Sequence, residues 1–111
     1  MNPRSLAHRL LAASAAIAFV VLVGRITDRT TGQSLSRLTV TLTGPSHAST
    51  RTGPDGRYRL GRLRPGLYRL VIRGKGVPTV RTQIKLEGRE VSKDFVVCNI
   101  ALDYSCSNPP Q

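Results

Sequence analysis

The sequence predicts an all-β fold, a small Greek-key antiparallel β-sandwich of about seven strands that follows an N-terminal signal peptide. Three observations lead to this prediction. The chain has 111 residues, which is enough for one domain only. Apolar and polar residues alternate with a period of two through most of it, and turn residues punctuate that alternation about every 8–12 residues. No segment with the period of a helix follows the N-terminal apolar stretch.

Residues 1–18 are expected to be a signal peptide that is cleaved after Ala18, with Ala15 as the alternative site. Arg4 and Arg9 precede a short apolar run, and small residues two apart follow it. An uncleaved membrane anchor is the alternative, but the apolar run is shorter than the roughly 18–20 residues that span a bilayer. We therefore expect a periplasmic or secreted protein that is not an integral membrane protein after cleavage.

Residues 19–97 are expected to form the sandwich. The segment FVVLVGRIT predicts a first strand, and a polar loop follows it. RLTVTLT is the clearest strand, because its leucines and valine share one face and its threonines share the other. A short strand is expected around residues 49–52. TVRTQIKL and REVSKDFVV predict the last two strands, with apolar residues on one face of each.

The segment TGPDGRYRLGRLRPGLYRLVIRGKG predicts two strands between turns. Asp55 and Gly56 suit the first turn, and Pro65 and Gly66 suit the second. In RYRLGRL and LYRLVIR the apolar residues alternate with arginines, so the arginines are expected to face outward. The candidate basic face consists of Arg57, Arg59, Arg69 and Arg73.

Residues 98–111 are expected to form a disulfide-closed tail. Cys98 and Cys106 are the only cysteines, and an exported chain meets an oxidising compartment. Two cysteines and one distant histidine cannot supply the usual four ligands of a structural zinc site, so no metal is expected.

Several motifs in this chain resemble those of the carboxypeptidase regulatory-like domain family. They are VGRITDRTTGQSLSRLTVTLTG and the turn-strand segment from residue 52 to residue 76, and the resemblance covers roughly residues 20–86. It implies a transthyretin-like sandwich, grouped with carbohydrate-binding-like folds, with an accessory and non-catalytic role. It also implies that Asp55-Gly56 makes a hairpin turn and that Pro65-Gly66 lets Tyr68 pack inward, as Tyr58 does. Arg37 departs from the family pattern, and no binding residue is carried over.

The motifs exclude several functions. No helix follows the glycines of the turn-strand segment, so it cannot be a phosphate-binding loop. Its tyrosines alternate with its arginines, so the sheet lacks a basic face with exposed rings that would bind nucleic acid. His47 is alone in the mature chain, and the acids are scattered, so neither catalytic residues nor a cofactor is expected.

The net charge of +11 is compatible with an anionic partner, and equally with a genome that favours arginine codons. The leading hypothesis is an exported, non-catalytic module that acts as an accessory, structural or protein-interaction domain on an envelope or secreted protein partner. The alternative is binding of carbohydrate or an anionic polymer, such as an acidic polysaccharide, through the arginine-rich sheet face.

Overall fold

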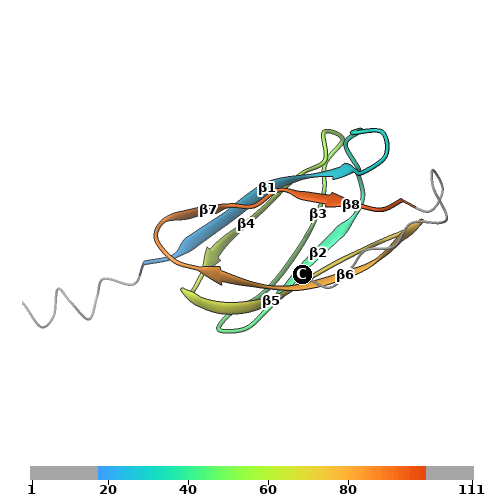
Figure 1. Cartoon of the computed structure of the whole chain (residues 1–111). Helices are drawn as coiled ribbons and strands as arrows, with labels where there is room; N and C mark the ends of the chain where they lie inside the picture. Colours follow the sequence, from blue (N-terminus) through green and yellow to red (C-terminus); the bar gives the residue numbers. More distant parts are fainter. Residues whose placement is uncertain (1–17, 100–111) are drawn as a thin grey trace, which may run out of the picture.

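The structure is a computed structural model that describes residues 18–99 of the chain. These residues form a β-sandwich of two sheets packed face to face (Figure 1). The strands are β1 (Val20–Asp28), β2 (Thr39–Thr43), β3 (His47–Arg51), β4 (Arg57–Leu63), β5 (Gly66–Gly74), β6 (Val77–Leu86), β7 (Glu90–Ser92) and β8 (Phe95–Val97). The predicted all-β sandwich is confirmed. The predicted signal peptide lies outside the described residues.

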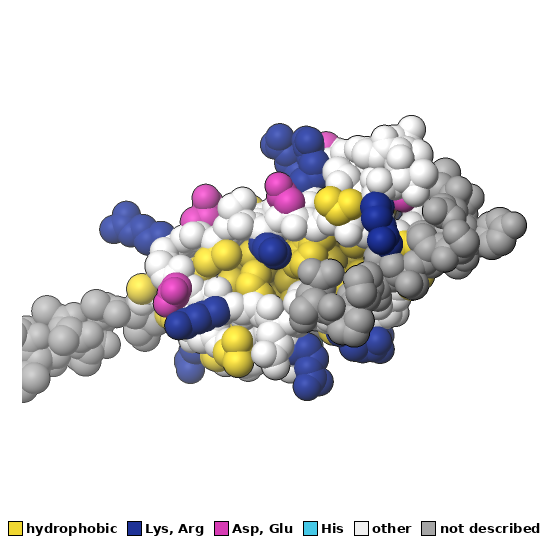
Figure 2. Space-filling view, viewed as in Figure 1, with side chains coloured by type: hydrophobic (Ala, Val, Ile, Leu, Met, Phe, Trp, Pro, Cys, Tyr) yellow, Lys and Arg dark blue, Asp and Glu magenta, His cyan; other side chains and the backbone are white. Residues whose placement is uncertain are grey.

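The first sheet has the strand order β4-β1-β7, with β8 also paired to β1, and the second has the order β3-β2-β5-β6. Residues 18–99 contain no helix, and therefore no helix that could cross a membrane. β3 and β4 are consecutive in the chain but belong to different sheets, and they lie side by side at one edge of the sandwich. Figure 2 shows apolar side chains gathered between the two sheets on the side where β6 and β8 lie.

The core follows from the period-two patterns. In β4, Tyr58 and Leu60 are buried while the arginines beside them are exposed, and β2 and β5 alternate in the same way. Side chains pointing inward from both sheets exclude water from the interior, which is the main stabilising term of the fold. Among them are Leu22, Ile26, Val40, Leu42, Leu70, Ile72, Leu86, Phe95 and Val97.

The C-terminal strands differ from the sequence prediction in two respects. REVSKDFVV forms two short strands instead of one, and both pair with β1 in parallel. The pairings Val21 with Glu90 and Thr27 with Val96 share one register offset, so β7 and β8 are one strand interrupted at residues 93 and 94. At the interruption the chain crosses Gly24 so closely that a Cβ atom there would overlap the Lys93 carbonyl oxygen.

Candidate functional site

The four arginines predicted to form one basic face lie on two different sheets. Arg57 and Arg59 are exposed on β4, in the first sheet, and Arg69 and Arg73 are exposed on β5, in the second. The outer faces of a sandwich point away from each other, so these two pairs face opposite sides of the molecule. Figure 2 shows basic side chains along both sheets.

The two arginine pairs are separated because the chain changes sheets between β4 and β5. β4 pairs with β1, whereas β5 pairs with β2 and β6. The turn at Arg64 and Pro65 therefore connects the two layers and does not close a hairpin within one of them. Alternation along a strand shows which side chains face outward, but it does not show to which sheet the strand belongs.

An open groove of about 720 Å³ crosses the outer face of the first sheet. Its walls come from β1 and β4, from the end of β3, and from the segment around β7. The lining residues are Val23, Gly24, Arg25, Thr50, Arg51, Gly53, Arg57, Tyr58, Arg59, Ser92 and Asp94. Alternation along β4 predicted Arg57 and Arg59 of this set, but no pattern in the sequence pointed to Arg25, Arg51 or Asp94.

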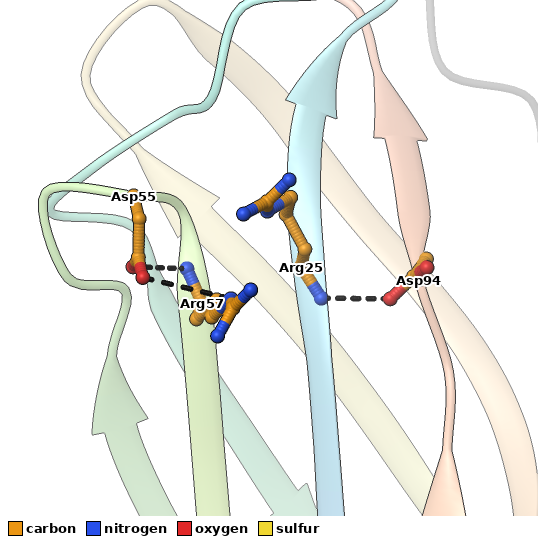
Figure 3. A network of polar contacts seen from close by, with 4 residues as sticks. All are labelled: Arg25, Asp55, Arg57 and Asp94. Atoms are coloured by element: carbon orange, nitrogen blue, oxygen red, sulfur yellow. Dashed lines mark hydrogen bonds and ion pairs between the residues drawn. The ribbon is translucent and has the colours of Figure 1, made fainter.

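Two arginines face each other at the centre of the groove. Arg25 on β1 is directly opposite Arg57 on β4, and like charges in this position repel. An acid flanks each of them (Figure 3). Asp55 lies 3.6 Å from the Arg57 Nε atom and accepts a 3.1 Å hydrogen bond from the Arg57 backbone N–H. Asp94 accepts a 2.9 Å hydrogen bond from the backbone N–H of Arg25.

Tyr58 lies beneath the groove and is held as a neutral hydroxyl. Its side chain is buried, and the hydroxyl donates a 2.6 Å hydrogen bond to the Lys93 carbonyl oxygen. Burial, with a smaller contribution from the charge of Asp94, raises the pKa of Tyr58 well above its ordinary value. This hydroxyl therefore fixes the segment that crosses Gly24.

The turn that precedes β4 is built from backbone hydrogen bonds. The Gly56 N–H donates to the Gly53 carbonyl at 2.9 Å, and the Gly53 N–H donates to the Arg57 carbonyl at 2.9 Å. Gly56 has a φ of +77°, and a Cβ atom there would lie 2.6 Å from the Ile26 carbonyl oxygen. Asp55 and Gly56 thus set both the turn and its contact with β1. The turn joins β3 and β4, which lie in different sheets, so it is not the hairpin turn that was expected.

The Tyr68 hydroxyl forms hydrogen bonds with two loops at one end of the sandwich. Its buried side chain donates a 2.6 Å hydrogen bond to the Arg64 carbonyl and accepts a 3.1 Å hydrogen bond from the Ser46 N–H. Pro65 is exposed, and Gly66 follows it with a φ of +146°. A Cβ atom on Gly66 would lie 2.7 Å from the Pro45 ring, so the close contact of these loops needs glycine.

The remaining polar candidates are structural or solvent-facing. His47 is exposed and begins β3, where it pairs with Thr43. Asp28 is buried at the end of β1, and its Oδ2 atom accepts three hydrogen bonds from Thr30 and Thr31. No group of three metal-ligating side chains occurs within residues 18–99. Cys98 is buried, but Cys106 lies outside that range, so the disulfide between them stays a prediction.

Comparison with known proteins gives a family and a fold. The family model of the carboxypeptidase regulatory-like domain matches residues 21–101, which confirms the resemblance seen in the motifs. No curated protein matches the sequence. Hydroxyquinol 1,2-dioxygenase from Pseudomonas putida DLL-E4 aligns with a TM-score of 0.64 and 8% identity, over 74% of this chain and 57% of the enzyme.

Two further solved structures, a DUF3823 family protein and a pilin, have a similar fold. A DUF3823 family protein from Parabacteroides merdae ATCC 43184 aligns with a TM-score of 0.58 and 23% identity, over 74% of this chain and 47% of that one. A streptococcal ancillary pilin aligns with a TM-score of 0.60 and 15% identity, over 75% of this chain and 30% of the pilin. This chain thus spans less than two thirds of each of the three structures. At such identities the likeness shows a shared β-sandwich fold.

Proposed function

Because the chain belongs to the carboxypeptidase regulatory-like domain family, we propose that it is an exported, non-catalytic module that acts through its surface on an envelope or secreted protein partner. The family is a regulatory-like domain and not a catalytic one. The observation that supports this proposal is the chemistry of the groove. Arginines dominate it, and both of its neighbouring acids accept hydrogen bonds from strand backbone. Arginines and acids in this arrangement can recognise a partner by charge. They do not provide a nucleophile with a general base beside it.

Affinity purification tests the proposal. The full chain, with a C-terminal tag, is crosslinked in intact cells and recovered from the envelope and the medium. We expect one envelope or secreted protein to be enriched, and we expect less of it when Arg57→Glu and Arg59→Glu reverse the charge of the groove. Recovery of cytoplasmic proteins alone, or of no protein, would contradict the proposal.

Export is tested in the same experiment. The recovered chain should lack its first residues, and intact-mass measurement should give a new N-terminus at Phe19, or at Ala16 if the alternative site is used. A full-length mass in the membrane fraction would show that residues 1–18 are an uncleaved membrane anchor and not a cleaved signal peptide.

A second candidate function is binding of an acidic polysaccharide. It is favoured by the arginines on the outer faces of both sheets, because guanidinium groups form paired hydrogen bonds with carboxylate, sulfate and phosphate. Binding of this kind should weaken steeply as salt rises, since exposed charges are screened. A polysaccharide affinity that did not change between 50 and about 500 mM salt would exclude the arginines as its cause.

A further inference from the structure

We propose that the outer face of the β3-β2-β5-β6 sheet is the surface that binds an acidic polysaccharide, with Arg69, Arg73 and Arg81 holding its oxyanion groups. This inference rests on the second candidate function and assigns it to one of the two basic sides. The outward side chains of these four strands make up the proposed face. They are Thr39, Thr41, Thr43, His47, Ser49, Arg51, Leu67, Arg69, Val71, Arg73, Arg81, Gln83 and Lys85.

The strand register arranges these side chains in rows across the sheet. One row runs from Ser49 through Thr41 and Val71 to Arg81. The next runs from His47 through Thr43 and Arg69 to Gln83, and a third holds Arg51, Thr39 and Arg73. None of the side chains that define this face is a carboxylate.

Three of the arginines surround one point on the face. Arg81 is directly opposite Val71, so it is diagonal to both Arg69 and Arg73, at about 7–8 Å between backbones. Arg69 and Arg73 are four residues apart on β5, or roughly 13 Å. A hollow of about 310 Å³ lies beside this point, between Arg69 and β6, and is lined by Arg69, Arg81, Thr82 and Gln83; Arg73 lies outside it. The spacing suits a chain that carries an oxyanion on successive units.

The three arginines at the centre of this face are not neutralised from within the described chain. Among residues 18–99, Asp55 is paired with Arg57 in the groove, and Glu87 is paired with Lys85 at the end of β6. Asp94 also lies beside Arg25 in the groove, so the groove carries its own counter-charges. Arg69, Arg73 and Arg81 have none, and a bound polyanion would relieve their mutual repulsion.

The neutral groups of the face favour a polysaccharide over other polyanions. Hydroxyls of Thr41 and Ser49 lie 3.2 Å apart between the arginines, where they can exchange hydrogen bonds with sugar hydroxyls. No aromatic ring belongs to the face, so nucleic-acid bases would have nothing on which to stack. The residue at the centre of the face is the half-buried Val71. A protein interface more often has a large aromatic side chain at its centre. Leu67 is its one large exposed apolar side chain, which is too little for insertion into a membrane.

The test compares two matched triple variants of the full chain. Arg69→Gln/Arg73→Gln/Arg81→Gln removes three charges from the proposed face, and Arg25→Gln/Arg57→Gln/Arg59→Gln removes three from the groove. Affinities for polygalacturonate and heparin are measured by calorimetry at low salt, with dextran as the neutral control. We expect the face variant to lose about 10- to 100-fold in affinity, because three charge-assisted contacts are removed. The groove variant should lose less than about threefold. Circular dichroism and thermal unfolding verify that both variants fold.

Each other outcome overturns the inference. Equal losses in both variants would show attraction by net charge alone, and a loss confined to the groove variant would place binding there. A single-stranded oligonucleotide or phosphatidylglycerol vesicles that bound more tightly than both polysaccharides would identify a different occupant. If the face variant binds polysaccharide as tightly as the wild-type protein does, the inference fails and the second candidate function stands. If wild-type protein binds neither polysaccharide, both fail, while recovery of a protein partner would leave the leading proposal intact.

Discussion

Tyr58 connects the core, the groove and the C-terminal strands through one hydroxyl. It is buried against Phe95, with ring centroids 6.5 Å apart, and it holds the Lys93 carbonyl. Tyr58→Phe should lower the free energy of unfolding by about 1–2 kcal/mol, because the partly buried Lys93 carbonyl loses its donor. Urea unfolding measures the change. An unchanged midpoint would show that water replaces the hydroxyl without cost.

The same hydroxyl predicts an alkaline limit to stability. An unfolded tyrosine ionises near pH 10, whereas burial keeps native Tyr58 protonated at a higher pH. Above about pH 10 the unfolded state therefore binds fewer protons than the native state, and the free energy of unfolding falls by up to about 1.4 kcal/mol per pH unit. Below pH 10 this contribution is fully present. Unfolding measured from pH 8 to 11 should show a shallower decline in Tyr58→Phe than in the wild type.

Arg37 occupies a backbone conformation that favours glycine. Its φ is +61°, in the loop before β2, and this is the position at which the sequence departs from the family pattern. Arg37→Gly should raise the free energy of unfolding by up to about 1 kcal/mol, since removal of left-handed strain exceeds the added entropy of glycine. The control Arg73→Gly, in extended β5, should lower it. If both variants lost stability, strain at Arg37 would not be the cause.

At the scale of elements, β7 and β8 depend on the absence of a side chain at position 24. The Lys93 carbonyl crosses Gly24, and it could not do so beside a Cβ atom. Gly24→Ala should cost about 1–3 kcal/mol, because the backbone of residues 93 and 94 has to move. Hydrogen exchange should show the loss first in the amides of β7 and β8. Gly61→Ala is the matched control, since a Cβ there would meet only the flexible end of Arg59, 3.5 Å away.

These elements also show where sequence reasoning reaches its limit. Alternation predicted the inward placement of Tyr58 and Tyr68 and the outward placement of the arginines beside them, because it reflects burial along one strand. It could not predict that β4 and β5 lie in different sheets, which divides the arginines into two sets. Nor could it place Arg25 opposite Arg57, because pairing between distant strands is set by tertiary packing.

At the scale of the whole molecule, charge opposes compactness. The chain carries a net charge of +11, and its Arg57–Asp55 and Lys85–Glu87 ion pairs are solvent-exposed contacts of 3.6 and 3.7 Å. Such pairs contribute little, whereas Arg25 opposite Arg57 and the cluster around Val71 repel within each sheet. The native state gathers these charges at shorter distances than the unfolded chain does, so their repulsion lowers stability.

Salt should therefore stabilise this protein. The screening length falls from about 30 Å at 0.01 M salt to about 10 Å at 0.1 M, which is comparable to the distances between the arginines on one face. We expect Tm to rise by several degrees over this range, equivalent to a gain on the order of 1 kcal/mol for a domain of this size. Sodium chloride is the appropriate salt, because sulfate and phosphate would also bind the arginines. Both triple arginine-to-glutamine variants should have a higher Tm at low salt and a smaller rise. A wild-type Tm that stayed constant or fell with sodium chloride would show that the two arginine sets do not repel strongly enough to affect folding.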